Sequence, residues 1–357
     1  MRKVKYIVVG QGLAGTILAQ TLLKQGDSVV IIDDPALSGA SRIAAGLYNP
    51  VVFKRLVKSW MADELIPFMD QFYKEAETQL GINCYNSKQI VKLFAEENEK
   101  EFWLKKTNDE VGQYLSKTID IDFLNDLLIN PLGSSEVISA GNLNTGMFLR
   151  SFREHFLKKN ILVEEKFEYD KLHISENSIS YKDLEAEKII FCEGHKTTLN
   201  PYFDWLPFKL TKGEIITIRF KENKIIPIEK VINKGVFILP LANNTYKVGA
   251  TYEWNDLTEE TTDKGLNELT EKLQKVVKVP FEIIDHQAGI RPTVNDRRPL
   301  IGIHPKYSSI AIFNGMGTKG VMLAPYFAEM FSKSLKNGEK LHSEVDIQRF
   351  LSKHNKL

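Results

Sequence analysis

Cysteine is scarce in this sequence, with Cys84 and Cys192 the only two among 357 residues. They lie far apart, and neither belongs to a CxxC pair or to a cluster with histidine. This excludes a disulfide framework and a cysteine-based zinc site, and it favours a reducing compartment. The 7 histidines show no HExxH or HxH spacing, so we expect no metal site.

Long hydrophobic runs and an excess of one charge are also missing. No apolar run reaches the roughly 18 residues of a membrane span, and the first one, Tyr6–Val9, is too short for a signal peptide. We therefore predict a cytoplasmic protein with no membrane partner. The 47 Lys and Arg residues balance 46 Asp and Glu residues, so the net charge of +1 gives no bulk attraction to nucleic acid. A small basic cluster of Lys54, Arg55 and Lys58 is typical of a solvated face.

The rest of the composition is typical of a globular protein. Hydrophobic residues make up 43% and charged residues 26%, and the 22 Gly and 13 Pro are scattered along the chain. At about 150 residues per domain, the length predicts roughly two domains. Such a chain buries enough core to enclose a ligand.

A strand, a helix and a second strand are predicted at the start of the chain. Val4–Val9 and Val29–Ile32 are short β-branched runs typical of buried strands. Between them, GxGxxG at residues 10–15 opens a helical apolar pattern. Asp33 ends the second strand about 20 residues after the glycines, where a carboxylate accepts hydrogen bonds from a ribose diol. We favour Asp33 over Asp34 because Asp34 precedes a proline and is typical of a turn.

Each residue of the glycine turn has a physical task. Gly10 permits the tight turn, Gly12 lets the backbone approach a pyrophosphate, and Gly15 lets the helix pack closely on the strand. The N–H groups at the start of the helix, at Leu13 and Ala14, offer positive potential to phosphates. We therefore predict dinucleotide binding; the alternative is a glycine-rich turn in an unrelated α/β protein.

Small and hydroxyl-bearing residues fill the segment 38–46. Such a segment is typical of backbone that lies against phosphate and ring rather than in a core. Ser41, Arg42, Ala45 and Gly46 are its candidate cofactor-binding residues; the alternative is a plain loop before a helix. The glycine turn alone does not distinguish FAD from NAD, and this segment helps to make that choice.

Five motifs follow one another along the chain: GASRIAAG at 39–46, KGE at 212–214, GAT at 249–251, AGIRPTVNDRRPLIG at 288–302 and NGMGTKGVMLAP at 314–325. In this order they resemble the FAD-dependent D-amino acid oxidase, glycine oxidase and sarcosine oxidase superfamily. Within it, GTKG and GATYE are similar to the FAD-dependent half of the bifunctional enzyme that modifies the tRNA wobble uridine. KGE is similar to glycine oxidase.

The resemblance implies an α/β fold, with a Rossmann-like FAD-binding domain and an inserted α+β substrate domain built on an antiparallel sheet. It implies FAD as cofactor and oxidation of the C–N bond of an amino acid or N-substituted glycine, by hydride transfer to flavin N5 and hydrolysis of the imine. The implied partners are a small amine that bears a carboxylate, and O₂ or another electron acceptor.

The two kinds of pattern alternate along the chain, which predicts domains that are not continuous in sequence. The pattern is helical at 97–117 and 146–160 and strand-like at 161–165, 187–194, 210–220 and 236–253. Gly194, at the end of one strand, is a further candidate cofactor-binding residue. We expect an FAD-binding domain at 1–85, 140–213 and 286–357, and a substrate-binding domain at 86–139 and 214–285.

Arg291 lies in the sequence GIRP. The following Pro292 favours an extended conformation at the end of a strand, and a guanidinium there binds a carboxylate through two parallel hydrogen bonds. The resemblance implies that this arginine anchors the substrate carboxylate. The alternative is a surface arginine that pairs with Asp296.

The segment from Asn314 to Gly320 precedes a helical pattern and is rich in glycine. Such a turn aims N–H groups and a positive helix end at an anion, which we take to be the flavin N1–C2=O edge; the alternative is a simple capping turn. Its candidate cofactor-binding residues are Gly315, Gly317, Thr318, Lys319 and Gly320. Lys319 is also a candidate catalytic residue, with a solvated lysine as the alternative, and for Lys212 we favour a structural role.

Two positions depart from the resembling families. Phe237 stands where glycine oxidase has a tyrosine whose hydroxyl helps to hold substrate, which places glycine itself in doubt as the substrate; Tyr252 or Tyr48 could supply a hydroxyl instead. Met316 stands where some sarcosine oxidases attach the flavin through cysteine, so we predict noncovalent FAD.

The favoured hypothesis is therefore an FAD-dependent amino acid or amine oxidoreductase. One alternative uses the same chemistry to remove carboxymethyl from a tRNA wobble uridine, although the balanced charge does not favour tRNA as a partner. Another alternative is a flavin-binding protein without turnover.

Overall fold

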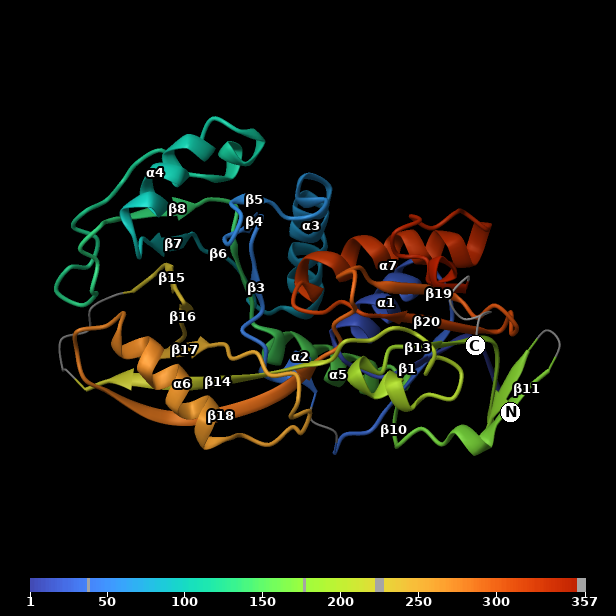
Figure 1. Ribbon diagram of the computed structural model, residues 1–357. Helices are drawn as coiled ribbons and strands as arrows, with labels where there is room; N and C mark the ends of the chain where they lie inside the picture. Colours follow the sequence, from blue (N-terminus) through green and yellow to red (C-terminus); the bar gives the residue numbers. More distant parts are fainter. Residues whose placement is uncertain (37–38, 176–177, 222–227, 352–357) are drawn as a thin grey trace.

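The computed structural model describes residues 1–36, 39–175, 178–221 and 228–351, and two large β-sheets form its framework (Figure 1). The first sheet lies with helices α1 and α7 in one half of the view, and the second lies with α6 in the other half. The predicted α/β fold with an inserted, mostly antiparallel sheet is confirmed.

Five parallel strands form the centre of the first sheet, and near-continuous apolar runs explain their burial on both faces. The crossover helix α1 (Leu13–Lys24) joins the first two of them as predicted. Strand β13 is central because it pairs with β1 along one side and with β20 and β12 along the other. In spatial order the parallel strands are β10 (Leu162–Glu164), β2 (Val29–Asp33), β1 (Arg2–Val9), β13 (Leu184–Phe191) and β20 (Ile310–Asn314); β19 (Leu300–Ile303), β12 (Ile179–Tyr181) and β11 (Leu172–Ile174) extend the sheet.

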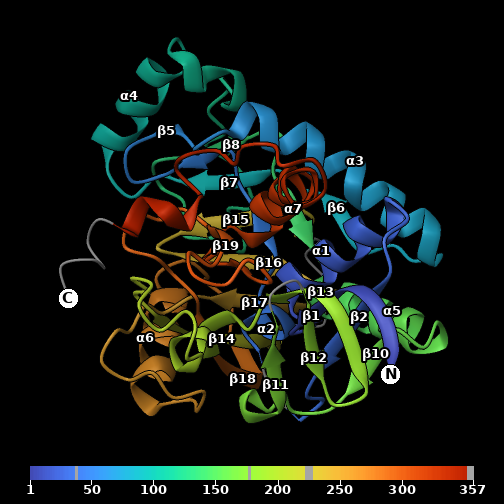
Figure 2. The same cartoon turned by 90° about the vertical axis from the view of Figure 1, so that its right-hand side faces the viewer.

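Helices cover one face of this sheet, as Figures 1 and 2 both show for α1 and α7. The helix predicted at 146–160 is observed as α5 (Thr145–Lys158), and its spacing brings Phe148, Phe152 and Phe156 into the same fully buried core. Helix α3 (Ala62–Leu80) completes this layer together with α7 (Gly320–Asn337).

The second sheet takes its strands from two separate parts of the chain. Its helix α6 (Asp263–Gln274) packs on it through Leu269 and Leu273. The turn between two of its strands has Asn243 and Asn244 in the left-handed region, as a tight hairpin requires. In spatial order the strands are β18 (Phe281–Arg291), β14 (Thr211–Phe220), β17 (Thr245–Gly249), β16 (Val236–Pro240), β15 (Val231–Lys234), β7 (Ile90–Leu93) and β8 (Ser134–Val137).

The helical region expected at 97–117 is shorter than predicted. Helix α4 (Glu97–Lys106) ends at Thr107, and a 3₁₀ turn (Glu110–Tyr114) follows. Only Trp103 of α4 is buried, so little packing extends this helix beyond its charged first turns.

Short elements connect the two large sheets. They are α2 (Ala40–Ile43), the small sheet of β3 (Leu47–Tyr48), β9 (Gly141–Leu143) and β6 (Tyr85–Ser87), and the hairpin of β4 (Val51–Val52) and β5 (Val57–Lys58). Among the described residues, no helix has both the length and the apolar character needed to cross a membrane.

The expected domain borders after residues 213 and 285 fall inside strands. Residues 211–213 belong to β14 and residues 286–291 to β18, and these strands pair along their whole length, from Thr211 opposite Arg291 to Phe220 opposite Phe281. We propose to place these borders at 210/211 and 291/292, because this keeps each strand whole.

Candidate functional site

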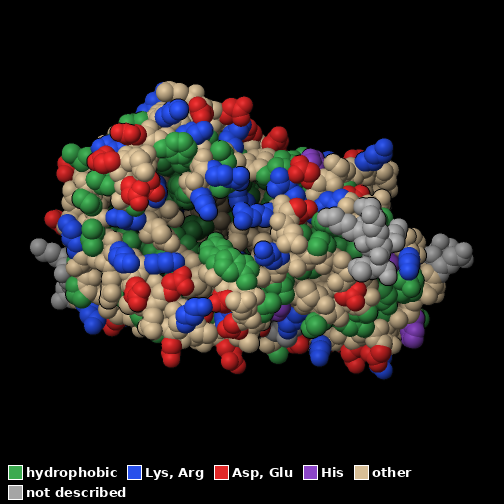
Figure 3. All heavy atoms as spheres, viewed as in Figure 1, with side chains coloured by type: hydrophobic (Ala, Val, Ile, Leu, Met, Phe, Trp, Pro, Cys, Tyr) green, Lys and Arg blue, Asp and Glu red, His purple; other side chains and the backbone are tan. Residues whose placement is uncertain are grey.

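A cavity of about 880 Å³ lies between the two sheets. Figure 3 shows a hollow in the middle of the molecule, with Lys and Arg side chains gathered beside it. All predicted site residues except Gly15 and Gly315 line this cavity: Gly10, Gly12, Leu13, Ala14, Asp33, Ser41, Arg42, Ala45, Gly46, Gly194, Arg291, Gly317, Thr318, Lys319 and Gly320.

The glycine turn has the close packing that its motif requires. Gly10 has a φ of +101°, and a Cβ on Gly15 would stand 1.8 Å from the carbonyl oxygen of Gly10. Gly15 therefore serves the contact between helix and strand and does not reach the cavity. Gly12 caps α1 without a side-chain hydrogen bond, and the Leu13 N–H donates to Ser41 Oγ at 3.2 Å. The start of α1 thus faces the cavity with its N–H groups and positive potential.

Asp33 stands at the end of β2 and is held by two residues that the sequence did not single out. Its Oδ1 accepts from the Gln11 N–H at 2.8 Å, and its Oδ2 accepts from Arg153 Nη1 at 2.7 Å. Arg42 Nη2 lies 3.4 Å from Oδ2. Asp34 instead accepts from a backbone N–H two residues further on, as predicted for a turn.

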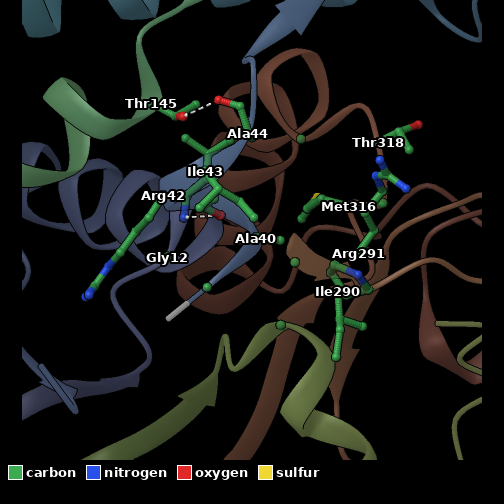
Figure 4. A pocket seen from close by; sticks show the side chains of 18 of the residues that line it. Gly12, Ala40, Arg42, Ile43, Ala44, Thr145, Ile290, Arg291, Met316 and Thr318 are labelled. Atoms are coloured by element: carbon green, nitrogen blue, oxygen red, sulfur yellow. Dashed lines mark hydrogen bonds between the residues drawn. The ribbon is translucent and has the colours of Figure 1, made fainter. Parts of the chain in front are cut away.

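The segment 39–46 lies between the glycine turn and the second sheet. Thr145 Oγ1 donates to the Ala44 carbonyl at 3.2 Å, drawn as a dashed line in Figure 4. A Cβ on Gly46 would stand 1.9 Å from the Leu143 carbonyl oxygen, which explains the glycine. Ile43 packs against Gly289 of β18, and a Cβ on Gly289 would stand 2.5 Å from Ile43 Cδ1. Ser38 of this motif lies outside the described residues.

The loop before α7 is tied to the turn after β13. Asn314 Nδ2 donates to the Gly194 carbonyl at 2.9 Å and to Thr197 Oγ1 at 2.6 Å. Gly315 has a φ of +74° and packs against the backbone of Leu300, so it shapes the loop without reaching the cavity. Met316 does line the cavity. The structure thus joins two predicted cofactor-binding segments that are far apart in sequence.

Arg291 ends β18 and extends into the cavity. Figure 4 shows it on the same side as Met316 and Thr318, while Gly12 and Arg42 lie on the other side. Its guanidinium makes only long hydrogen bonds to carbonyl oxygens, from Nη1 to Lys212 and Thr251 at 3.3 Å and from Nη2 to Thr251 at 3.4 Å. Burial lowers the pKa of this guanidinium.

No carboxylate among the described residues pairs with Arg291. The alternative partner, Asp296, instead binds Arg349, with Nε 3.0 Å from Oδ2. Room for the guanidinium comes from Gly213 on β14, where a Cβ would stand 1.9 Å from Nη2. The ring of Tyr252 covers the guanidinium, with 4.7 Å from Cζ to the ring centroid.

The two lysines considered in the sequence have different environments. Lys212 is fully buried, and its Nζ bonds Asp256 at 2.5 Å and Thr258 at 3.2 Å, which supports the structural role favoured for it. Lys319 lines the cavity and donates to Ser59 Oγ. Burial and two neighbouring arginines lower the pKa of Lys319 to about 8, and its side chain is only partly exposed to solvent.

Phe237 lines the cavity without a hydroxyl, as expected. Of the two tyrosines considered as substitutes, Tyr252 lines the cavity, whereas Tyr48 is buried against Tyr85 with ring centroids 5.4 Å apart. Asn233, which was not predicted from the sequence, lies opposite Phe237 in the β15–β16 register and also lines the cavity. Residues opposite each other in a strand pair share a face, so an amide stands beside the aromatic ring.

The cavity fits a flavin dinucleotide. A glycine turn with an open helix N-terminus at one end suits a pyrophosphate, and the carboxylate of Asp33 lies at the nearby strand end. The loop from Met316 to Gly320 adds backbone N–H groups at a second helix N-terminus, where charge on a reduced ring would be stabilised.

Comparisons with known proteins agree with this geometry. The chain is 23% identical over 320 residues to the tRNA 5-methylaminomethyl-2-thiouridine biosynthesis bifunctional protein MnmC of Legionella pneumophila, covering 84% of this chain but 45% of that protein. It is 22% identical to glycine oxidase of Bacillus subtilis, covering 95% and 94% of the two chains. The structure of glycine oxidase from Bacillus cereus superposes with a TM-score of 0.77 at 19% identity, over 94% of this chain and 96% of that one.

A family model decides the wider assignment. The model described as DAO, FAD dependent oxidoreductase, matches residues 5–334, which is nearly the whole chain. The motifs quoted above fall within that match, and the family's cofactor is the one that the cavity fits. The chain therefore belongs to the DAO family of FAD-dependent oxidoreductases.

Proposed function

We propose that this enzyme oxidises the C–N bond of an amino acid or an N-substituted glycine. The observation that carries the proposal is Arg291, a partly buried guanidinium that lines the cavity and has no carboxylate partner among the described residues. A buried cation without a counterion is costly, and a substrate carboxylate would supply two parallel charge-assisted hydrogen bonds.

The residues around Arg291 would orient the substrate. Gly213 leaves the space that the guanidinium occupies, and Tyr252 holds it from one face. With the carboxylate fixed, the amine end of the substrate would lie in the part of the cavity lined by Phe237 and Asn233. Bound FAD supplies the two-electron acceptor for C–N oxidation. Positioning is then the main task of the protein, and no side-chain base is needed for an amine that binds uncharged.

The test is an anaerobic panel of amino acids and N-substituted glycines mixed with the FAD-loaded protein. We expect at least one member to bleach the flavin absorbance, and its imine product to hydrolyse to a carbonyl compound. Readmission of O₂ would then separate an oxidase, which forms peroxide, from an enzyme that needs another acceptor. A flavin that no amine reduces would contradict the proposal and favour a flavin-binding protein without turnover.

A second candidate function is removal of carboxymethyl from a tRNA wobble uridine. One observation favours it: Tyr252 and Trp254 are exposed and stacked, with ring centroids 6.4 Å apart, and Tyr252 lines the cavity. Exposed aromatic rings bind bases by stacking. Of the basic cluster, Lys54 and Arg55 are exposed, whereas Lys58 pairs with Asp63 at 2.6 Å.

Salt-sensitive tRNA binding distinguishes this second function. Binding that weakens steeply with salt and falls in Trp254→Ala would support it. Binding that is absent at low salt would exclude it and leave the small amine as substrate. A cytoplasmic location remains a prediction that rests on two buried free cysteines.

A further inference from the structure

Among the described residues, the part of the cavity formed by the second sheet has positive charge and no negative charge. The acidic residues of the described ranges that line the cavity, Asp33, Asp34, Glu165 and Glu193, all end or follow strands of the first sheet. From the described part of the second sheet, Arg291 is the only charged residue that lines the cavity.

Lys319 adds a second cation. Its ammonium donates to Ser59 Oγ, and Ser59 in turn donates to the Asn49 carbonyl at 3.0 Å. Ser59 directly follows the β4–β5 hairpin, and Val51 and Phe53 of that hairpin share a core with Phe237. Lys319 therefore contacts the segment that packs on the second sheet.

This ammonium lacks a counterion. In the described part of the chain, no carboxylate lies within ion-pair distance of Lys319, and the charged groups that act on it are Arg298 and Arg297. Arg298 is itself satisfied, with Nε 2.7 Å from Glu344 and its guanidinium over the Trp60 ring. Like charges and burial both disfavour the protonated lysine, and a bound anion would reverse that effect.

We propose that the substrate carries a second carboxylate, which Lys319 binds while Arg291 holds the first. This inference rests on the proposed function and names the substrate class more narrowly, as an amine with two carboxylates. The same cavity is lined by apolar side chains such as Val231 and Phe237 and by the amide of Asn233. These suit a short carbon chain with one polar centre. A single carboxylate would leave one of the two cations unpaired.

Ligand binding tests the inference without turnover. The FAD-loaded protein is titrated with succinate and glutarate, and with the monomethyl ester of each, while the flavin absorbance is followed. We expect each diacid to bind about tenfold or more tightly than its ester, because a desolvated charge pair contributes of the order of 1.4 kcal/mol or more. Lys319→Met should bring the diacid to the level of the ester and change the affinity for the ester by less than about threefold.

Two further variants test whether the preference for the diacid depends on the positive charge at position 319. Lys319→Arg should keep the preference for the diacid, and Lys54→Met, which removes an exposed lysine of the β4–β5 hairpin, should leave it unchanged. Equal binding of diacid and ester, or a preference that survives in Lys319→Met, would overturn the inference. A Lys319→Met protein with an altered flavin reduction potential and an intact preference would also overturn it and assign the lysine to the cofactor.

The outcomes for the inference and for the proposed function differ. Equal affinity for diacid and ester, combined with reduction of the flavin by a monocarboxylic amine, would overturn only the inference. Failure of every carboxylate to bind and of every amine to reduce the flavin would overturn both.

Discussion

The two ends of the cavity differ in how their charges are paired. At the first sheet, Asp33 is bound by Arg153 and by the Gln11 backbone, so its charge is compensated within the protein. At the other end, Arg291 of the second sheet and Lys319 of the loop before α7 have no carboxylate partner in the described residues. An unpaired buried charge destabilises the folded protein, and a bound ligand of opposite charge removes that cost. We therefore expect the substrate to bind at this second end.

The strongest test of this comparison removes the cation of the second sheet. Arg291→Met should lower kcat/KM for a carboxylate substrate by about 10²- to 10³-fold, because a charge-assisted pair of about 3–4 kcal/mol is lost. Its affinity for FAD should change by less than about threefold. Equal losses of affinity for substrate and for FAD would mean that Arg291 contributes to both ends of the cavity.

A smaller effect is expected when the cation is kept but displaced. Gly213→Ala adds a Cβ that would stand only 1.9 Å from Arg291 Nη2, so the guanidinium must move. We expect KM to rise about 10-fold to 10²-fold with an unchanged flavin content, because misplaced binding groups lose their alignment. The matched control is Gly146→Ala on α5, where the nearest atom would be a side-chain nitrogen at 3.4 Å. An unchanged KM in Gly213→Ala would show that the site tolerates the shift.

A substitution at the first sheet should weaken the binding of FAD and leave the binding of substrate unchanged. Asp33→Asn removes a charge that faces Arg153, and we expect FAD to bind about tenfold more weakly, since a charged hydrogen-bond partner contributes roughly 1.5–3 kcal/mol. Titration of the apoprotein with FAD measures this, with Asp34→Asn as the comparison for which a smaller change is expected. A loss of substrate affinity at saturating FAD would contradict the separation of the two ends.

The smallest expected effect concerns the neutral polar group at the second sheet. Asn233→Ala should raise KM for the amine substrate by about fivefold, because one neutral hydrogen bond contributes of the order of 1 kcal/mol. Steady-state kinetics at saturating FAD provide the measurement. An unchanged KM together with a lowered kcat would place the amide at the reacting centre and not at the binding step.

Features that depend on one short segment can be predicted from the sequence. Features that depend on contacts between distant segments cannot. The glycine turn and α1 follow from spacing within one segment, residues 10–24. Arg153 was missed because its link to Asp33 requires α5 to pack beside β2. Asn233 was missed because only the β15–β16 register places it beside Phe237. The burial of Lys319 likewise depends on a distant hairpin.

The pairing partners of β13 have a consequence for how the molecule is made. Its parallel neighbours in the sheet are β1, at the start of the chain, and β20, which begins more than a hundred residues after β13 ends. Strand β20 and the loop that follows it, up to Gly320, must therefore leave the ribosome before the nucleotide pocket is complete. We expect the cofactor to enter after synthesis, and the earlier, unfinished chain to rely on its own collapse or on chaperones until then.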